Sequence, residues 1–416
     1  MQRTSVKKQP WAKDAAARRK ETLAQQRKAR RDLAAHARQL AQFEVPLSPS
    51  RDVATQSMDV TLANKRTTRE ERVKKRREHF SKQLMTPEWL IDIPKDLNGS
   101  GSALGEGWYV LPRPEGKRCL VVANSGHTIA RIPSGSILKK FPSALPCGSH
   151  KTNKFNEGYC ILDCIFQEQD ETFYVLDVMC WKGYLLYNCT TEFRLYWVRE
   201  KLAEEATATV TPANCYRFLV RTPFLAMSAT RQESWQHIRQ HFLFSSECVL
   251  MRNKPCSFTP LRAPIECRDG LLFYMKASHY VMGLSPLALV WKDGNTSRFF
   301  VFSSKPSIVL RFEGAHNQFV TLEGIVLLTV DEDFIQQHEL TEGDLASFTY
   351  EQQEVQDGLT QHLNGLAFVK RCSAQRALPD SWTKILFQYK ARFGGIPIEH
   401  IVEVCAKVCD SISLHS

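Results

Sequence analysis

The sequence predicts an α+β protein whose body is rich in antiparallel strands. Three observations lead to this class. Residues 14–42 contain no Pro or Gly and consist mainly of strong helix formers. Residues 83–299 alternate short apolar, strand-like runs with turn residues. Residues 300–416 bring further strand-like runs before a last apolar helix. Together they predict a helical arm, an α+β body and a smaller β-rich C-terminal unit.

The composition is that of a globular protein with a sizeable core. Of the 416 residues, 43% are hydrophobic and 24% are charged. No apolar run approaches the roughly 20 residues of a membrane-spanning helix, so we expect no membrane contact. The charged N-terminus is unlike a secretory signal peptide, but its Arg-rich, acid-poor profile also fits an organelle transit peptide, which stays open as an alternative.

The basic charge is concentrated in the N-terminal fifth. Residues 1–43 hold twelve Lys or Arg against three acidic residues, and residues 65–82 hold nine against three. The formal net charge of the chain is +11, and residues 83–416 sum to −2. A basic tail on a nearly neutral body is typical of an interaction segment and not of a basic duplex-binding surface.

The arm, residues 1–43, is expected to form a helix over residues 14–42 that is marginal alone and becomes ordered on an acidic partner. A solvated helix and a nucleic-acid-binding arm are the alternatives. Residues 44–64 are expected to form a linker and residues 65–82 a second basic helix. We treat residues 44–82 as one segment that joins the arm to the body. A further helix is expected to begin at Thr86-Pro87-Glu88. The basic side chains of the arm are Arg18, Arg19, Lys20, Arg27, Lys28, Arg30, Arg31 and Arg38.

The elements of the body and of the C-terminal unit are predicted from apolar periodicity. In the body we expect helices at 196–205 and 230–243. In the C-terminal unit we expect strands within residues 299–350, 358–371 and 382–392. We expect a helix near residues 397–412. Expected strands of the body lie at 108–112, 119–124, 160–166, 172–181, 193–198, 269–276 and 287–291.

The thirteen cysteines lie mostly in apolar stretches, which indicates buried free thiols of a cytosolic or nuclear protein. Cys160 and Cys164, like Cys405 and Cys409, are four residues apart. Neither pair has the partner Cys or His spacing of a zinc site. We therefore expect neither a metal ion nor a cofactor.

The order of motifs in the body resembles the covalent nucleotidyltransferases, the mRNA capping enzymes and polynucleotide ligases. Their nucleophile pattern Lys-x-Asp-Gly-x-Arg corresponds to residues 113–118, where Gly116 and Arg118 fit but Arg113 replaces the lysine. Arginine stays protonated and is a poor nucleophile. The resemblance implies a nucleotide-binding fold that is not an enzyme. Later motifs correspond to residues 162–164, 174–178, 269–273 and 289–292; residues 382–387 are weakly similar to the last motif, on a barrel.

A closer resemblance is to the snurportin family of nuclear import adaptors. The arm from Ala17 to Gln42 is similar to that family's importin-β-binding domain. The resemblance implies partners: the trimethylguanosine cap of small nuclear RNA in its ribonucleoprotein, importin β through the arm's basic residues, and an export receptor for recycling. It implies shuttling between cytoplasm and nucleus. Matching body segments are residues 83–92, 116–118, 161–165, 174–183, 193–197 and 269–274.

The resemblance also implies a cap site. A methylated guanine is flat and cationic, so aromatic stacking should hold it. Trp291 matches the stacking tryptophan of the family, and Trp108 matches a residue expected at the methylated edge; an ordinary core role is the alternative for each. Glu106 is the candidate acceptor for guanine N1. Phosphates need cations or backbone donors, and the candidates are Ser125, Gly126, His127, Thr128, Lys139, Lys140, Lys276 and Lys292.

Two other functions stay open at this point. A capping-type guanylyltransferase or ligase would form a lysine–nucleotide adduct, and Arg113 at the nucleophile position argues against it. A general RNA-binding protein using its basic arm would bind without cap preference and with steep salt dependence. The near-neutral body makes that function less favoured.

Overall fold

The computed structural model describes residues 15–28, 30–42, 69–97, 107–150, 158–220, 224–225, 268–294, 296–297, 306–350, 366–372, 378–392 and 394–406. The predicted helix at 230–243 lies outside these residues, as does Glu106. Among the described residues, no helix is long and apolar enough to cross a membrane.

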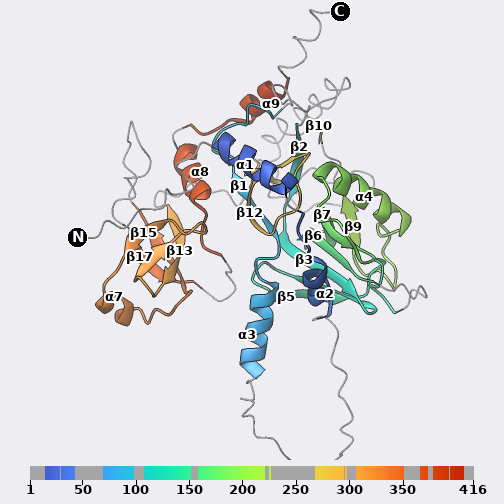
Figure 1. The fold of residues 1–416 in the computed structure, drawn as a ribbon, viewed down its shortest axis with the longest axis horizontal. Helices are drawn as coiled ribbons and strands as arrows, with labels where there is room; N and C mark the ends of the chain where they lie inside the picture. The colour runs from blue at the N-terminus through green and yellow to red at the C-terminus, as the bar shows by residue number, and fades with distance from the viewer. Residues whose placement is uncertain are drawn as a thin grey trace, which may run out of the picture.

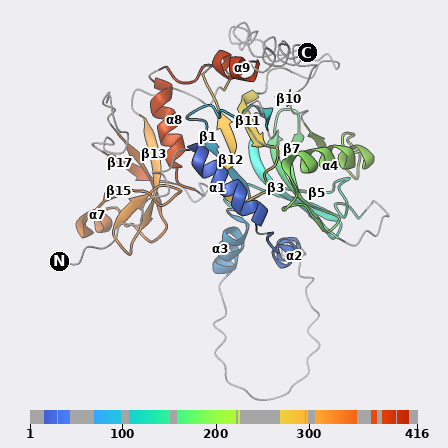
Figure 2. The same ribbon diagram turned by 45° about the horizontal axis from the view of Figure 1, so that its top comes forward.

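The N-terminal basic region forms three helices, α1 (Ala15–Lys28), α2 (Ala34–Gln42) and α3 (Arg69–Phe80). The single helix expected over 14–42 is therefore wrong, because residues 30–33 are not helical and separate α1 from α2. Helix α1 buries Leu23 and Gln26, and α2 buries Leu40. Both helices lie on the body of the same chain (Figures 1 and 2).

The first sheet has the strand order β1-β12-β11-β2-β10. Strand β1 pairs in parallel with β12, and the other neighbours are antiparallel. The helix expected from Thr86 is therefore wrong. Pro87 is accommodated because β1 is an edge strand whose register shifts after that residue. The bounds are β1 (Met85–Trp89), β2 (Trp108–Pro114), β10 (Phe224–Leu225), β11 (Arg268–Met275) and β12 (Gly283–Trp291).

The second sheet has the order β5-β4-β3-β6-β7-β8, and β9 pairs with β7 in parallel. Helix α4 (Thr191–Glu204) packs on β7. The strand expected at 193–198 is wrong: Thr190 caps α4 by accepting a hydrogen bond from the Phe193 N–H. The bounds are β3 (Lys117–Asn124), β4 (His127–Arg131), β5 (Ile137–Phe141), β6 (Cys160–Gln167), β7 (Thr172–Trp181), β8 (Tyr184–Leu185) and β9 (Arg217–Val220).

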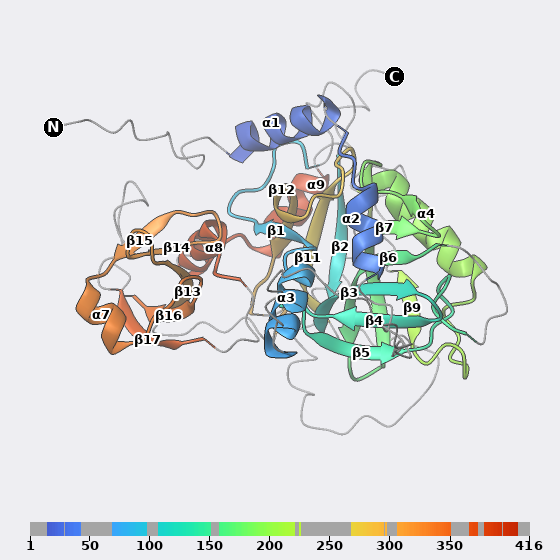
Figure 3. The same cartoon turned by 60° about the horizontal axis from the view of Figure 1, so that its bottom comes forward.

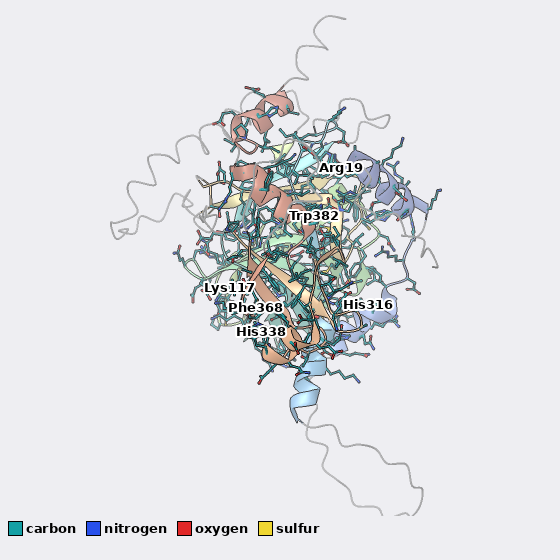
Figure 4. The ribbon with its side chains drawn as sticks, turned by 90° about the vertical axis from the view of Figure 1, so that its left-hand side faces the viewer. Arg19, Lys117, His316, His338, Phe368 and Trp382 are labelled. Atoms are coloured by element: carbon teal, nitrogen blue, oxygen red, sulfur yellow. The ribbon has the colours of Figure 1, made fainter. Side chains whose placement is uncertain are left out.

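The C-terminal unit is a five-stranded antiparallel sheet of order β15-β14-β13-β16-β17 with its own hydrophobic core. The ring of His338, the residue after α7, lies 4.0 Å from that of Phe368 on β17 between centroids (Figure 4). Residues 382–392, expected as a strand, form a helix. The bounds are β13 (Ser307–Glu313), β14 (Gln318–Val320), β15 (Val326–Thr329), α7 (Glu332–Gln337), β16 (Leu345–Thr349), β17 (Ala367–Arg371), α8 (Trp382–Arg392) and α9 (Ile398–Ala406).

The two faces of the first sheet enter different cores, because side chains alternate along each strand. On one face Leu111, Tyr274 and Val290 pack with residues of the second sheet such as Ile161. The opposite face carries Trp108, Val110, Leu271, Phe273, Leu289 and Trp291, and it packs with α8 and α9. Figure 3 shows α9 next to β12.

Candidate functional site

Trp108 and Trp291 lie on the same face of the first sheet. Trp108 begins β2 and pairs with Met275, whereas Trp291 ends β12 and pairs with Leu271. Those two partners are four positions apart on β11, so the tryptophans are offset by roughly 13 Å along the strand direction. The structure therefore brings both predicted cap-binding tryptophans to one surface without stacking them on each other.

Both tryptophans are buried. Trp108 is 0% exposed and Trp291 is 1% exposed. The residues that cover this face include Leu23 of α1, Phe387 of α8 and Ile401 of α9. The indole N–H of Trp291 donates to the backbone carbonyl of Ile396 at 2.9 Å. Neither ring is open to a ligand in this arrangement, so their role in stacking stays a prediction.

A pocket of about 180 Å³ lies at the end of β12. Trp291 and Lys292, two of the predicted site residues, line it. Its other walls come from the residues after β1 and β12, from α8 and from the linker between α8 and α9, and no pattern in the sequence pointed to them. These residues are Leu90, Ile91, Asp293, Phe387, Lys390, Ala391, Gly394, Gly395, Ile396 and Pro397.

Behind the pocket, three side chains converge on Asp269. Lys292 donates from Nζ to Asp269 Oδ1 at 2.6 Å, and Arg113 and the Ser297 hydroxyl also donate to this carboxylate. Burial lowers the pKa of Lys292, the nearby Arg113 guanidinium lowers it too and Asp269 opposes both, so that the pKa of Lys292 is about 8. The arginine at the expected nucleophile position thus serves as an ion-pair partner.

Gly270 makes this cluster geometrically possible. Its φ is +86°, and a Cβ at this position would lie 2.1 Å from the Trp291 carbonyl oxygen and 2.8 Å from Lys292 Cγ. The register of β11 against β2 shifts between Arg268 and Leu271, which is where glycine allows a bulge. Glycine therefore lets β11 approach the end of β12 closely.

The carboxylates of two predicted family motifs form buried ion pairs. Arg118 donates to Asp163 at 3.0 Å and 2.6 Å, and the Tyr280 hydroxyl donates to the same carboxylate at 2.8 Å. Asp177 pairs with Arg194 through two hydrogen bonds. These carboxylates hold the sheets and α4 in place and do not face the pocket.

The predicted phosphate partners fall into two groups. Lys276 lies beside Trp108: its backbone N–H donates to Gly107 O at 3.0 Å, and its Nζ is 5.2 Å from the centre of the Tyr109 ring. Apart from Lys292 at the pocket, the remaining candidates lie on the second sheet, away from Trp291. They are the turn residues Ser125 and Gly126, His127 and Thr128 at the start of β4, and Lys139 and Lys140 on β5.

Thr128 is unsuited to a ligand contact in this arrangement. It is 0% exposed, and its hydroxyl is hydrogen-bonded to that of Ser143 at 2.6 Å. Ser125 and Gly126 both have positive φ and form the tight turn between β3 and β4. The turn was expected near the cap because of the family resemblance, whereas the structure places it in the hairpin of the second sheet.

The basic residues of the arm divide by exposure. Arg18 pairs with Glu88 at 2.7 Å, and Arg19 is 8% exposed (Figure 4). Gln26 accepts from the backbone N–H of His279 at 2.9 Å, which ties α1 to the turn after β11. Six of the eight predicted importin-binding residues are exposed: Lys20, Arg27, Lys28, Arg30, Arg31 and Arg38.

In the part of the chain that the structure describes, no group of three or more His, Cys, Asp or Glu side chains could hold a metal ion. Cys119, Cys160, Cys164 and Cys180 are free and buried, and burial raises the pKa of each of these thiols. Such thiols are packed as small apolar groups.

The two facing sheets and the helices that pack on them form an α+β body rich in antiparallel strands, as the sequence predicted, and Arg113, Asp269 and Lys292 lie in one cluster at its edge. Residues 83–267 match a family model described as the m3G cap-binding domain of Snurportin1. This match confirms the resemblance to the snurportin family over these residues. Trp108 lies within the matched residues, and Trp291 lies beyond them.

Among the solved structures that align with this chain are DNA ligases. A Lig E DNA ligase, studied for DNA binding with a minimal scaffold, is 12% identical, with 70% of this chain and 98% of the ligase covered and a TM-score of 0.29. A mycobacterial DNA ligase D with ATP is 13% identical, covering 73% and 99%, with a TM-score of 0.31. The ATP-dependent ligase of bacteriophage T7 is 10% identical, covering 70% and 99%, with a TM-score of 0.31. Similarity this low says nothing about the activity of this chain.

Proposed function

We propose that this protein is a nuclear import adaptor that binds the trimethylguanosine cap of small nuclear RNA and links the capped ribonucleoprotein to importin β. The observation that carries the proposal is the match of residues 83–267 to the m3G cap-binding domain. Trp108 and Trp291 on one sheet face support it, because a flat cationic base needs aromatic surfaces.

The cations near the tryptophans suggest how the charged cap bridge is held. Lys292 lines the pocket beside Trp291, whereas the ammonium group of Lys276 lies over the ring of Tyr109, which belongs to the core on the other face of the sheet. An ammonium group beside a stacked base suits a bridging phosphate. In this proposal the base lies on the tryptophan face and the phosphates extend toward Lys292.

The arm supports the import half of the proposal. Its exposed basic residues, from Lys20 to Arg38, form helical surfaces that an acidic receptor would bind. Binding of this segment by importin β, release in the nucleus and return through an export receptor would make the protein shuttle between cytoplasm and nucleus. We propose these partners from the arm's sequence and its exposed charge.

The proposed protein acts by binding and not by catalysis. Arg113 takes the position of the nucleophilic lysine and donates to Asp269. A guanidinium is permanently protonated and therefore forms no covalent nucleotide adduct. Incubation with radiolabelled GTP or ATP should leave the protein unlabelled, whereas a stable lysine adduct would favour a guanylyltransferase or ligase.

The decisive experiment is a fluorescence titration of the full chain with trimethylguanosine cap dinucleotide, beside the singly methylated cap dinucleotide. We expect quenching of tryptophan fluorescence and clear preference for the trimethylated form. Equal binding of both caps, or of uncapped RNA with steep salt dependence, would contradict cap-specific import and favour general RNA binding through the basic arm.

A further inference from the structure

The end of the described chain occupies the sheet face that carries Trp108 and Trp291. We call residues 394–406, the linker after α8 together with α9, the cover segment. Its side chains Ile398, Ile401 and Val402 are buried in the same hydrophobic cluster as the two tryptophans. The carbonyl of Ile396 accepts the Trp291 indole hydrogen bond. The cover segment therefore occupies part of the surface on which a base would stack, beside Leu23 of α1 and Phe387 of α8.

The covered arrangement leaves one polar group unsatisfied. The indole N–H of Trp108 is buried and has no hydrogen-bond partner among the residues that the structure describes. A buried donor without an acceptor destabilises the arrangement that buries it. Uncovering the face would return this N–H to water or to an acceptor on a ligand. Opening of the face would therefore remove the free-energy cost of burying an unpaired donor.

The cover segment begins with two glycines, and the first turn of chain after α8 is closed by a hydrogen bond from the Gly395 N–H to the Lys390 carbonyl at 2.9 Å, whereas α8 itself is anchored to β1. Gly394 and Gly395 have φ of +108° and +52° and connect α8 to the linker. Lys390 in α8 donates from Nζ to Ile91 O at 3.0 Å and to Asp92 at 2.9 Å. Hinges are usually a few loop residues that absorb the backbone rotation. The glycine pair therefore allows α9 to move while α8 stays on β1.

The closed pocket is too small for the proposed ligand. Its volume is about 180 Å³, whereas sites for small ligands usually enclose roughly 300–1,000 Å³. Residues 394–397 of the cover segment form one wall, and Lys390 of anchored α8 forms another. Removing the first wall would enlarge the pocket and expose Trp291, while Lys390 and Lys292 would remain beside it.

We propose that the cover segment is a lid built into the chain, which competes with the cap for the tryptophan face. This inference rests on the proposed function. Cap binding and docking of α9 exclude each other, so the cap binds molecules in which the lid has swung away about Gly394–Gly395. The apparent affinity for the cap is reduced in proportion to the open fraction.

The first test compares two substitutions on adjacent residues of α9 in the full chain. Ile401→Asp places a charge on the buried face of the lid, and His400→Asp places the same charge on its exposed face. Titration with trimethylguanosine cap dinucleotide should show about tenfold or greater tightening for I401D, because a minor open state is usually populated at 10% or less. H400D should bind like the unmodified chain. Equal or weaker binding by I401D would overturn the lid.

The second test needs no substitution. Hydrogen exchange of the α9 amides, followed by mass spectrometry, should become faster when cap dinucleotide is added; unchanged or slower exchange would overturn the lid. The two proposals fail in different ways. If the unmodified chain, I401D and H400D bind cap equally tightly, the lid proposal is wrong and the proposed function stands. If neither the unmodified chain nor I401D binds cap, although acrylamide quenching shows exposed tryptophans in I401D, the proposed function fails and the lid's competition with cap fails with it.

Discussion

The guanidinium of Arg194 and the carboxylate of Asp177 form a bidentate ion pair from which solvent is excluded. Nε lies 2.8 Å from Oδ1 and Nη2 lies 2.9 Å from Oδ2, and the two side chains are 0% and 1% exposed. Arg194 also donates to the carbonyls of Cys189 and Ser278. One side chain thus joins α4 to β7 and to the turn after β11, beside the proposed cap-binding sheet.

Substitution of Arg194 by Met should strongly destabilise the body. It leaves the Asp177 carboxylate buried without its counter-ion, and breaking a buried pair in this way costs about 3–5 kcal/mol. Urea unfolding followed by circular dichroism measures the change. The control is Arg199→Met in the same helix, where the pair with Glu200 is exposed and should cost less than about 1 kcal/mol. Similar losses for both variants would contradict a structural role for the buried pair.

Most strands of the body could be predicted because their apolar runs are local signals. The exceptions have physical causes. Residues 193–198 are aromatic and apolar, which favours a strand, but Thr190 caps a helix, and Leu195, Val198 and Leu202 follow helical spacing toward the core. Residues 86–88 look like a helix start, yet hydrogen bonding to β12, about two hundred residues later, makes them a strand. Such long-range pairing has no local signature.

The site could be predicted only in part. The sequence placed Trp108 and Trp291 at strand ends, and alternation does put them on one face. Sequence reasoning missed that Leu23, Phe387 and Ile401 cover this face, because the covering helices lie far along the chain in both directions. It also grouped the turn at 125–128 with the tryptophans, although that turn belongs to the other sheet.

Replacing Trp291 with Leu should weaken cap binding by about 1–3 kcal/mol, the usual contribution of stacking on one base. Because Trp291 is also buried, its loss should lower stability too, so binding must be measured where the variant is folded. Trp181→Leu is the matched control: that side chain is equally buried, at 1% exposure, but belongs to the core of the second sheet. If both variants keep full cap affinity in the fluorescence titration, Trp291 is not part of the site.

The arm and the body should act as separate binding modules. Changing Arg27, Lys28, Arg30 and Arg31 together to Glu should abolish capture by immobilised importin β, because the exposed positive surface becomes negative. Cap affinity in the fluorescence titration should be unchanged. The control changes exposed Lys75, Arg76 and Arg77 of α3 to Glu, which should spare importin β binding. Simultaneous loss of both partners in the arm variant would contradict two separate modules.

Lys292 should give the folded chain a distinctive pH dependence. It keeps its proton in the unfolded chain up to a pKa of 10.5 but releases it near pH 8 when folded. The unfolded chain binds more protons between these values, so the Lys292 contribution to stability rises with pH across this window. Relative to Lys292→Met, the wild type should gain on the order of 2–3 kcal/mol from pH 7.5 to 10. Urea unfolding at both pH values measures this gain, with exposed Lys140→Met as the control; a constant difference from K292M would contradict the pKa shift.

Gly270→Ala should damage the pocket more than the same change at Gly283. Both glycines have positive φ, +86° and +81°, so each substitution carries a similar backbone strain, of order 1–3 kcal/mol. They differ in space: a Cβ at Gly270 would lie 2.1 Å from the Trp291 carbonyl oxygen, whereas nothing lies within 4 Å of one at Gly283. Backbone at that distance has to move, which displaces the end of β12 together with Trp291 and Lys292. We therefore expect G270A to lower both the free energy of unfolding and cap affinity, and G283A to lower only the former. Equal cap affinities in the two variants would show that the position of Trp291 does not determine cap binding.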